Sequence, residues 1–102
     1  MHRLLILLTT ESNIIKAKKI ANSLIQKKLA SCISLKKIYS IYKWEGDVKE
    51  TEEVEITIKS KPQSRDDLID FLQKNSSYDI PQIIYKEFDT ESKYNDWVLN
   101  ST

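Results

Sequence analysis

The chain has 102 residues, a length at which one domain can bury a small core. Its residues are 40% hydrophobic and 30% charged, which is ordinary for a soluble globular protein. The net charge is only +1, so no overall field draws the chain toward nucleic acid or a membrane. A lone cysteine excludes an internal disulfide, and the apolar run Leu4–Leu8 is too short for a signal-peptide core or a membrane span. We therefore expect one cytoplasmic domain over residues 1–102.

The N-terminal third predicts a strand followed by a helix. Leu4–Leu8 is a continuous apolar run, which is typical of a central strand buried on both faces. Thr10 or Ser12 is expected to cap the helix that follows. That helix is indicated by residues at helical spacing, with lysines largely opposite them: Ile14, Ala17, Ile20, Ala21, Leu24 and Ile25.

A long hairpin is predicted next. Residues 31–42 and 48–60 have the pattern of two strands, and Lys43–Asp47 forms the tip around Gly46, the only glycine in the chain. A strand of about 12 residues spans about 40 Å. Helices of about 12–16 residues span only about 18–24 Å. The hairpin is therefore expected to extend beyond the helices that cover the sheet.

The extended part of this hairpin carries large apolar side chains, namely Tyr39, Ile41, Tyr42 and Trp44. A contiguous exposed patch of this kind usually marks an interface, and aromatic residues are enriched at interfaces. We therefore expect a homo-oligomer in which Tyr39, Tyr42 and Trp44 contact a neighbouring copy.

The remaining sequence predicts a second helix. Pro62 breaks the second hairpin strand, and Ser64 is expected to cap a helix that has Asp66 and Asp67 in its first turn. The apolar stripe of this helix consists of Leu68, Phe71 and Leu72. Residues 75–77 are polar and end the helix.

The C-terminal part predicts a last strand over Gln82–Phe88 and a short helix over Thr90–Leu99. The apolar face of that helix is expected to consist of Tyr94, Trp97 and Val98. The whole order is strand, helix, strand, strand, helix, strand and terminal helix. This order predicts an α+β fold of the ferredoxin-like βαββαβ plan, an antiparallel sheet with two helices on one face. Right-handed crossovers place the first and third strands in the centre.

Two functions that this fold often hosts are disfavoured by the sequence. An RNA-recognition module needs aromatic residues on the two central strands. Here the first strand is Leu and Ile throughout, and the third is acidic without an aromatic residue. A phosphate-binding loop after the first strand would need glycine or a cation, and residues 9–13 have neither. The lysine pairs along the chain are best explained as a solvated face balanced by glutamates.

Five segments, in order along nearly the whole chain, carry a family resemblance. They are Ala17–Ile25 with Lys28–Ser34, Ser40–Val48, Glu53–Ser60, Tyr78–Ile83 and Tyr94–Trp97. The first resembles the helix and cysteine-bearing strand of the CutA divalent-cation tolerance proteins. The second resembles their hairpin, S-x-Y-x-W-x-G-x-I/V, and the third resembles a strand that ends in Lys-Thr in the family. The fourth is similar to their Tyr-Glu-x-Pro-Glu-Ile segment, and the last matches their Tyr-x-x-Trp.

The resemblance implies a ferredoxin-like homotrimer, built by sheet-edge and hairpin contacts and related in architecture to PII-type signalling proteins. It also implies a link to copper and other divalent ions, with no established enzymatic reaction. This chain departs from the family in having Ser76 and Ser77 where the family commonly has His-Pro. An imidazole that has been proposed as a metal ligand is therefore missing.

The residues themselves allow only weak metal binding. Cys32 is the only thiol and His2 the only imidazole, so the chain lacks the donors of a four-ligand zinc site of nitrogen and sulfur. Thiolate prefers Cu(I), and a neighbouring copy can add donors. We therefore predict Cys32 and Asp79 as metal ligands for copper or another divalent cation. Their structural alternatives are a buried small hydrophobe for Cys32 and a turn former for Asp79.

Catalysis has no support in the sequence, because no Ser-His or Cys-His pair exists apart from the terminal His2. Three functions remain. The first is a trimeric cation-homeostasis protein that binds metal weakly. The second is a PII-like sensor of a small anionic or nucleotide-like ligand in clefts between subunits. The third is a structural or interaction trimer. Copper titration separates the first function from the others, and a ligand screen by thermal shift separates the second from the third.

Overall fold

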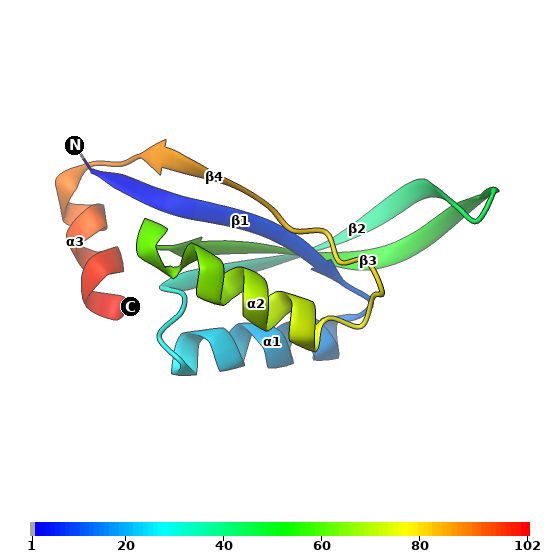
Figure 1. Cartoon of the computed structure of the whole chain (residues 1–102), viewed down its shortest axis with the longest axis horizontal. Helices are drawn as coiled ribbons and strands as arrows, with labels where there is room; N and C mark the ends of the chain where they lie inside the picture. The colour runs from blue at the N-terminus through cyan, green and yellow to red at the C-terminus, as the bar shows by residue number, and fades with distance from the viewer. Residues whose placement is uncertain (1) are drawn as a thin grey trace.

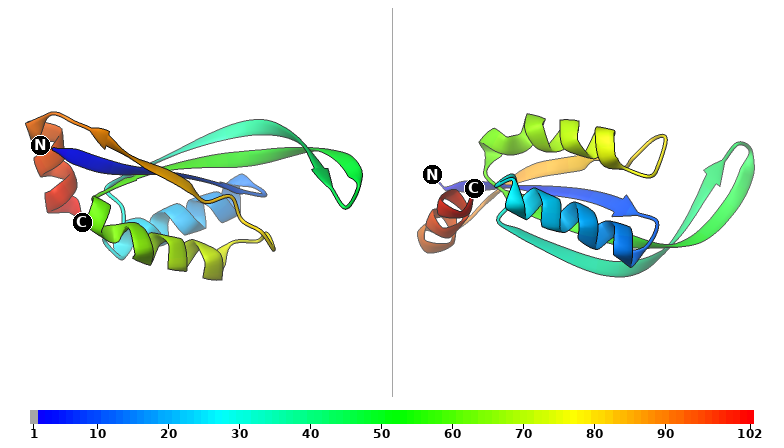
Figure 2. Two further views of the ribbon diagram at one scale, coloured as in Figure 1. Left: turned by 45° about the horizontal axis from the view of Figure 1, so that its top comes forward. Right: turned by 90° about the horizontal axis from the view of Figure 1, so that it is seen from below.

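The computed structural model describes residues 2–102, which form one antiparallel sheet with three helices (Figure 1). The strand order is β2-β3-β1-β4, so β1 and β3 are central, as predicted. Helices α1 and α2 lie side by side on one face of the sheet, and α3 lies at the end of the sheet near the N-terminus (Figure 2). This is the predicted ferredoxin-like α+β plan. The elements are β1 (Arg3–Glu11), α1 (Ile14–Gln26), β2 (Cys32–Trp44), β3 (Asp47–Ser60), a 3-10 turn (Pro62–Ser64), α2 (Arg65–Asn75), β4 (Ile84–Asp89) and α3 (Ser92–Ser101).

The core lies between the two central strands and the helix pair. Alternate residues of β1 and β3 point toward the helices because side chains alternate between the faces of a strand. The most deeply buried apolar side chains of the strands are Leu5, Leu7, Val54, Ile56 and Ile58. The helices contribute Ala17, Ile20, Leu24, Leu68 and Leu72 to the same cluster. The predicted helical and strand periodicities thus identified the core.

The β2–β3 hairpin extends well beyond the rest of the sheet, as predicted (Figure 1). Strand β1 ends at the pairing of Glu11 with Val54, which is opposite Lys37 on β2. Beyond this point β2 and β3 continue for seven residue pairs, from Ile38↔Glu53 to Trp44↔Asp47. Over this stretch the two strands are paired only with one another. We call residues 38–53 the hairpin arm; at about 3.3 Å per residue it is about 23 Å long.

The tip of the arm is tighter than the predicted five-residue turn. Strand β2 continues to Trp44 and β3 begins at Asp47, so only Glu45 and Gly46 form the turn. Both have positive φ angles, 52° and 84°. A two-residue hairpin turn with both central residues in this region is type I′, which follows the twist of the flanking strands.

The predicted cap was wrong at α1, and at α2 the predicted Ser64 is the N-cap residue but does not cap through its side chain. Thr10 is buried within β1, and Asn13 caps α1 by accepting a hydrogen bond from the Lys16 amide. Ser64 precedes α2 but makes no capping hydrogen bond through its side chain. The cause is Pro62, which begins a 3-10 turn and leaves Ser64 with helical angles of −85° and −1° instead of an extended conformation.

The terminal elements begin two residues later than predicted, with β4 at Ile84 and α3 at Ser92. Glu91 caps α3 through its carboxylate. Of the predicted apolar face of α3 only Val98 is buried, and Asn95 is buried beside it. Tyr94 and Trp97 instead stack on each other at a centroid distance of 5.7 Å, and Trp97 remains 47% exposed.

Candidate functional site

A groove of about 500 Å³ lies at the root of the hairpin arm, between β2 and the segment 76–83 that links α2 to β4. Strand β2 supplies Ser40, Tyr42 and Trp44, which lie on one face because they alternate along the strand. The linking segment supplies Tyr78 and Asp79 on the other side. Below we call this space the aromatic groove.

The segment 76–83 is attached to the sheet by two side-chain hydrogen bonds. On the helix side, the Ser77 amide donates to Oε2 of Glu11 at 3.1 Å. On the groove side, the Tyr78 hydroxyl donates to Oε1 of Glu53 at 2.8 Å. Since Val54 is in the core, its neighbour Glu53 points to the opposite face of the sheet. The two hydrogen bonds therefore attach the segment 76–83 to both faces of the sheet.

Glu11 is a buried carboxylate, with only 1% of its surface exposed. Its Oε1 accepts from the Ser12 amide at 2.8 Å, and its Oε2 accepts from the Ser77 amide. Burial raises the pKa of Glu11, but the hydrogen bonds from Ser12 and Ser77 outweigh burial and leave the pKa below its ordinary value of 4.5. Glu11 is therefore a buried negative charge at neutral pH.

Tyr78 remains protonated under all ordinary conditions. Burial, followed by the hydrogen bond to Glu53, raises the pKa of Tyr78 above its ordinary value of 10.0. The protonated phenol donates to Glu53 and so anchors the segment to the hairpin arm.

The two predicted metal ligands lie at opposite ends of the sheet. Cys32 begins β2 and is opposite Lys59, which pairs with Ile6. Asp79 lies in the segment that is bonded to Glu11, and Glu11 is five residues, or about 17 Å of strand, further along β1 than Ile6. Within residues 2–102 no three His, Cys, Asp or Glu side chains are close enough to hold one ion. One chain therefore does not fit a closed metal site, and the predicted roles of Cys32 and Asp79 stay predictions.

The three predicted interface residues do not share one face of the arm. Tyr42 and Trp44 line the aromatic groove and are each 41% exposed in the single chain. Tyr39 is an odd-numbered residue of the same strand, so it points to the opposite face, where it is 77% exposed. Their contact with a neighbouring copy stays a prediction.

Sequence reasoning missed the pairing of Glu11 with Ser77 and of Tyr78 with Glu53. A buried glutamate at the end of an otherwise apolar and Thr-rich strand was a visible signal. Its partner was not visible, because Ser77 is 66 positions away.

The lining of the aromatic groove includes Glu53 and Asp79 and no lysine or arginine, which disfavours an anionic or nucleotide-like ligand there.

Comparisons with known proteins agree over nearly the whole chain. A model of the CutA1 divalent ion tolerance protein family matches residues 5–101. The protein named "Protein CutA, chloroplastic" from Arabidopsis thaliana is 38% identical over 87 residues, which are 83% of this chain and 48% of that protein. The divalent-cation tolerance protein CutA of Pyrococcus horikoshii is 27% identical over 100 residues, 97% of this chain and 98% of that protein.

Solved structures give the same result. The crystal structure of CutA1 from Oryza sativa matches with a TM-score of 0.93 and 32% identity, covering 99% of this chain and 94% of that chain. The chain spans about half the length of the curated plant relatives that it matches.

Proposed function

The chain belongs to the CutA1 divalent ion tolerance protein family, and on this premise we propose that it is a homotrimeric protein of divalent-cation tolerance. In this proposal it binds copper weakly, catalyses no reaction and acts in the cytoplasm, although plant relatives are named as chloroplastic. The observation that carries the proposal is the family match over residues 5–101 together with the hairpin arm. No helix in residues 2–102 is long and apolar enough to cross a membrane.

The hairpin arm supports assembly because, among residues 2–102, no third strand pairs with it and only the segment 76–83 lies against one of its faces. A two-stranded hairpin is marginally stable in water when nothing covers it. This arm exposes Ile41 by 69% and Val48 by 71%, in addition to Tyr39. At the other edge of the sheet, β4 exposes Ile84, Tyr85 and Phe88. A closed cyclic assembly covers such edges without leaving a free one for further growth.

The metal part of the proposal rests on the donors that the chain contains. Cys32 is half-buried and is the only thiol, so we expect Cu(I) to bind there through the thiolate. Further ligands must come from a neighbouring copy, because Asp79 of the same chain is at the far end of the sheet. Protons compete for the thiolate, so affinity should fall as the pH is lowered.

Light scattering after size exclusion tests the assembly. We expect about three times the chain mass at micromolar concentration, and a monomer there would overturn the trimer. Copper titration of the same sample tests the metal site. Cys32→Ser should abolish binding while His2→Ala, the matched control, should change it little. Unchanged copper uptake by Cys32→Ser would show that Cys32 is not the ligand. Ser76→His should tighten binding if residue 76 faces the metal.

A further inference from the structure

The aromatic groove combines aromatic side chains with negative charge. Tyr42 and Trp44 line it from β2, and the lining also contains the carboxylates of Glu53 and Asp79 but no lysine or arginine. Its volume of about 500 Å³ lies within the range of about 300–1,000 Å³ that is typical of small-molecule sites. Both features attract a cation, because the face of an aromatic ring and a carboxylate each present negative potential.

Aromatic rings elsewhere on the surface of this chain already have a cation over them. On β4 the Arg65 guanidinium lies 5.7 Å from the centre of the Tyr85 ring, and the Lys86 ammonium lies 5.8 Å from the centre of the Phe88 ring. Within the part of the chain that the structure describes, the aromatic rings of the groove have no such partner. A cation for these rings must therefore come from outside the chain.

The carboxylates of the groove can also accept an external cation. Oε1 of Glu53 accepts from the Tyr78 hydroxyl at 2.8 Å, and Oε2 has no hydrogen bond among residues 2–102. Glu53 is only half-buried, and Asp79 is exposed and forms no ion pair in the described chain. Lys49 pairs with Tyr42 across the arm, but it does not line the groove. The negative charge in the lining is therefore accessible and not neutralised by a lysine of the lining.

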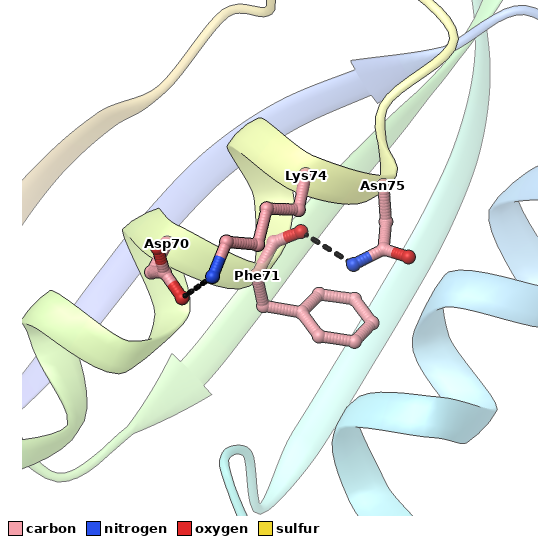
Figure 3. A network of polar contacts seen from close by, with 4 residues as sticks. All are labelled: Asp70, Phe71, Lys74 and Asn75. Carbon is pink, nitrogen blue, oxygen red and sulfur yellow. Dashed lines mark hydrogen bonds and ion pairs between the residues drawn. The ribbon is translucent and has the colours of Figure 1, made fainter.

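The wall of the groove opposite β2 begins at a supported helix end. In the last turn of α2, Asn75 Nδ2 donates to the Phe71 carbonyl at 2.8 Å, and Lys74 is paired with Asp70 at 3.0 Å (Figure 3). The segment 76–83 starts directly after this turn and is then bonded to the sheet on both faces. A wall that is positioned before binding reduces the entropy that a ligand must lose.

The lining also selects among cations. A metal ion is disfavoured, because within residues 2–102 no three His, Cys, Asp or Glu side chains are close enough to hold one. Ile80, which is 74% exposed, and Trp44 give the groove apolar surface in addition to its charge. A primary ammonium loses hydrogen bonds to water on such a surface, whereas a trimethylammonium group has no N–H to satisfy and presents methyl groups.

We propose that the aromatic groove binds a small organic cation that carries a trimethylammonium group. Its methyl groups contact Tyr42 and Trp44, and its charge is balanced by Glu53 and Asp79. All of these side chains belong to one chain, so the site goes beyond the proposed function and needs neither copper nor a second copy. The proposed trimer places a neighbouring copy against the same two aromatic residues, and assembly is therefore measured separately.

Choline and its uncharged analogue neohexanol test the role of the charge, because neohexanol has the same shape with carbon in place of nitrogen. Each is titrated into the full-length ¹⁵N-labelled protein at constant ionic strength, and the two tryptophan indole N–H signals are followed. Trp97 is an internal control, because α3 lies at the end of the sheet opposite the arm (Figure 1). We expect choline to shift the Trp44 signal saturably with a Kd of about 1 mM or tighter. Neohexanol should bind at least about tenfold more weakly.

Variants of the arm test the carboxylates. Glu53→Gln combined with Asp79→Asn should weaken choline binding about fivefold, and the glutamine oxygen can still accept from the Tyr78 hydroxyl. Glu50→Gln combined with Glu52→Gln is the matched control. It removes the same charge from the same arm, but at exposed positions on the opposite face, outside the lining. Choline binding should be unchanged in this control.

Light scattering on the same samples separates this inference from the proposed trimer. Saturable choline binding supports the groove whether the protein is trimeric or monomeric, and a monomer overturns only the trimer. A trimer without saturable binding would overturn the groove and leave the trimer intact. Equal binding of neohexanol, an equal shift of Trp97, or unchanged binding by the Glu53 and Asp79 double variant would each overturn the groove as a site for this cation.

Discussion

Replacing Glu11 by glutamine should destabilise the protein although the two side chains have nearly the same shape. The buried carboxylate accepts backbone amides of Ser12 and Ser77 on different oxygens. Glutamine keeps one acceptor oxygen and presents an NH₂ group to the other amide, so one of these bonds is lost. A hydrogen bond to a charged group contributes about 1.5–3 kcal/mol. We expect Glu11→Gln to lower the free energy of unfolding by about 2 kcal/mol at pH 7.

The stability difference between Glu11→Gln and the unchanged protein should depend on pH in a defined direction. The pKa of Glu11 is lower in the folded protein than its ordinary value of 4.5. Its stabilisation is therefore fully present above pH 4.5 and is lost as the pH falls through the folded pKa. Glutamine does not titrate, so the difference between the two proteins should shrink as the pH falls below 4.5.

Urea denaturation at one protomer concentration, at pH 7 and at the lowest pH where both proteins fold, measures the difference. Glu52→Gln is the control, because Glu52 is exposed on the hairpin arm. Equal stability of Glu11→Gln and the unchanged protein at pH 7 would refute the reasoning. A difference that stays constant on acidification would show that the charge of Glu11 is not the cause.

Three further changes test other parts of the structure. Tyr78→Phe removes the donor to Glu53 and should cost about 1 kcal/mol in urea denaturation. Gly46→Ala has free space around its new Cβ but must keep a φ of 84°, so it should destabilise the hairpin by about 1 kcal/mol, which thermal unfolding measures. Trp44→Ala should shift sedimentation toward smaller species, since a side chain 41% exposed in one chain has surface left for a neighbour to cover. Unchanged sedimentation would place Trp44 outside the contact.

The fold was predictable because it depends on patterns that are local in the sequence. The alternation of Val54, Ile56 and Ile58 and the helical spacing of Ala17 and Leu24 describe faces, and these faces are the buried ones. The length of the arm also followed from simple geometry. The caps were less predictable, because several polar residues precede each helix. Only the backbone angles decide which of them can bond.

The sites were harder to predict because they depend on distances through space. Nothing in the sequence places Ser77 against Glu11, or Cys32 and Asp79 at opposite ends of the sheet. Tyr39 and Tyr42 differ by an odd number of positions, so their opposite faces were readable from the sequence. Neighbouring copies would therefore have to contact both faces of the arm to cover Tyr39 as well as Tyr42 and Trp44.

The proposed trimer would supply two things that the single chain lacks. Seven residue pairs of the hairpin arm have no support from β1 or from a helix, although a hairpin alone is only marginally stable. The thiol of Cys32 likewise has no second soft donor among residues 2–102, since the only imidazole is the exposed His2. A neighbouring copy can correct the first deficit by packing on the arm. The same copy can correct the second only where the symmetry axis brings another donor to Cys32. Assembly can therefore be stable while metal affinity stays low, and the two properties should respond to different substitutions.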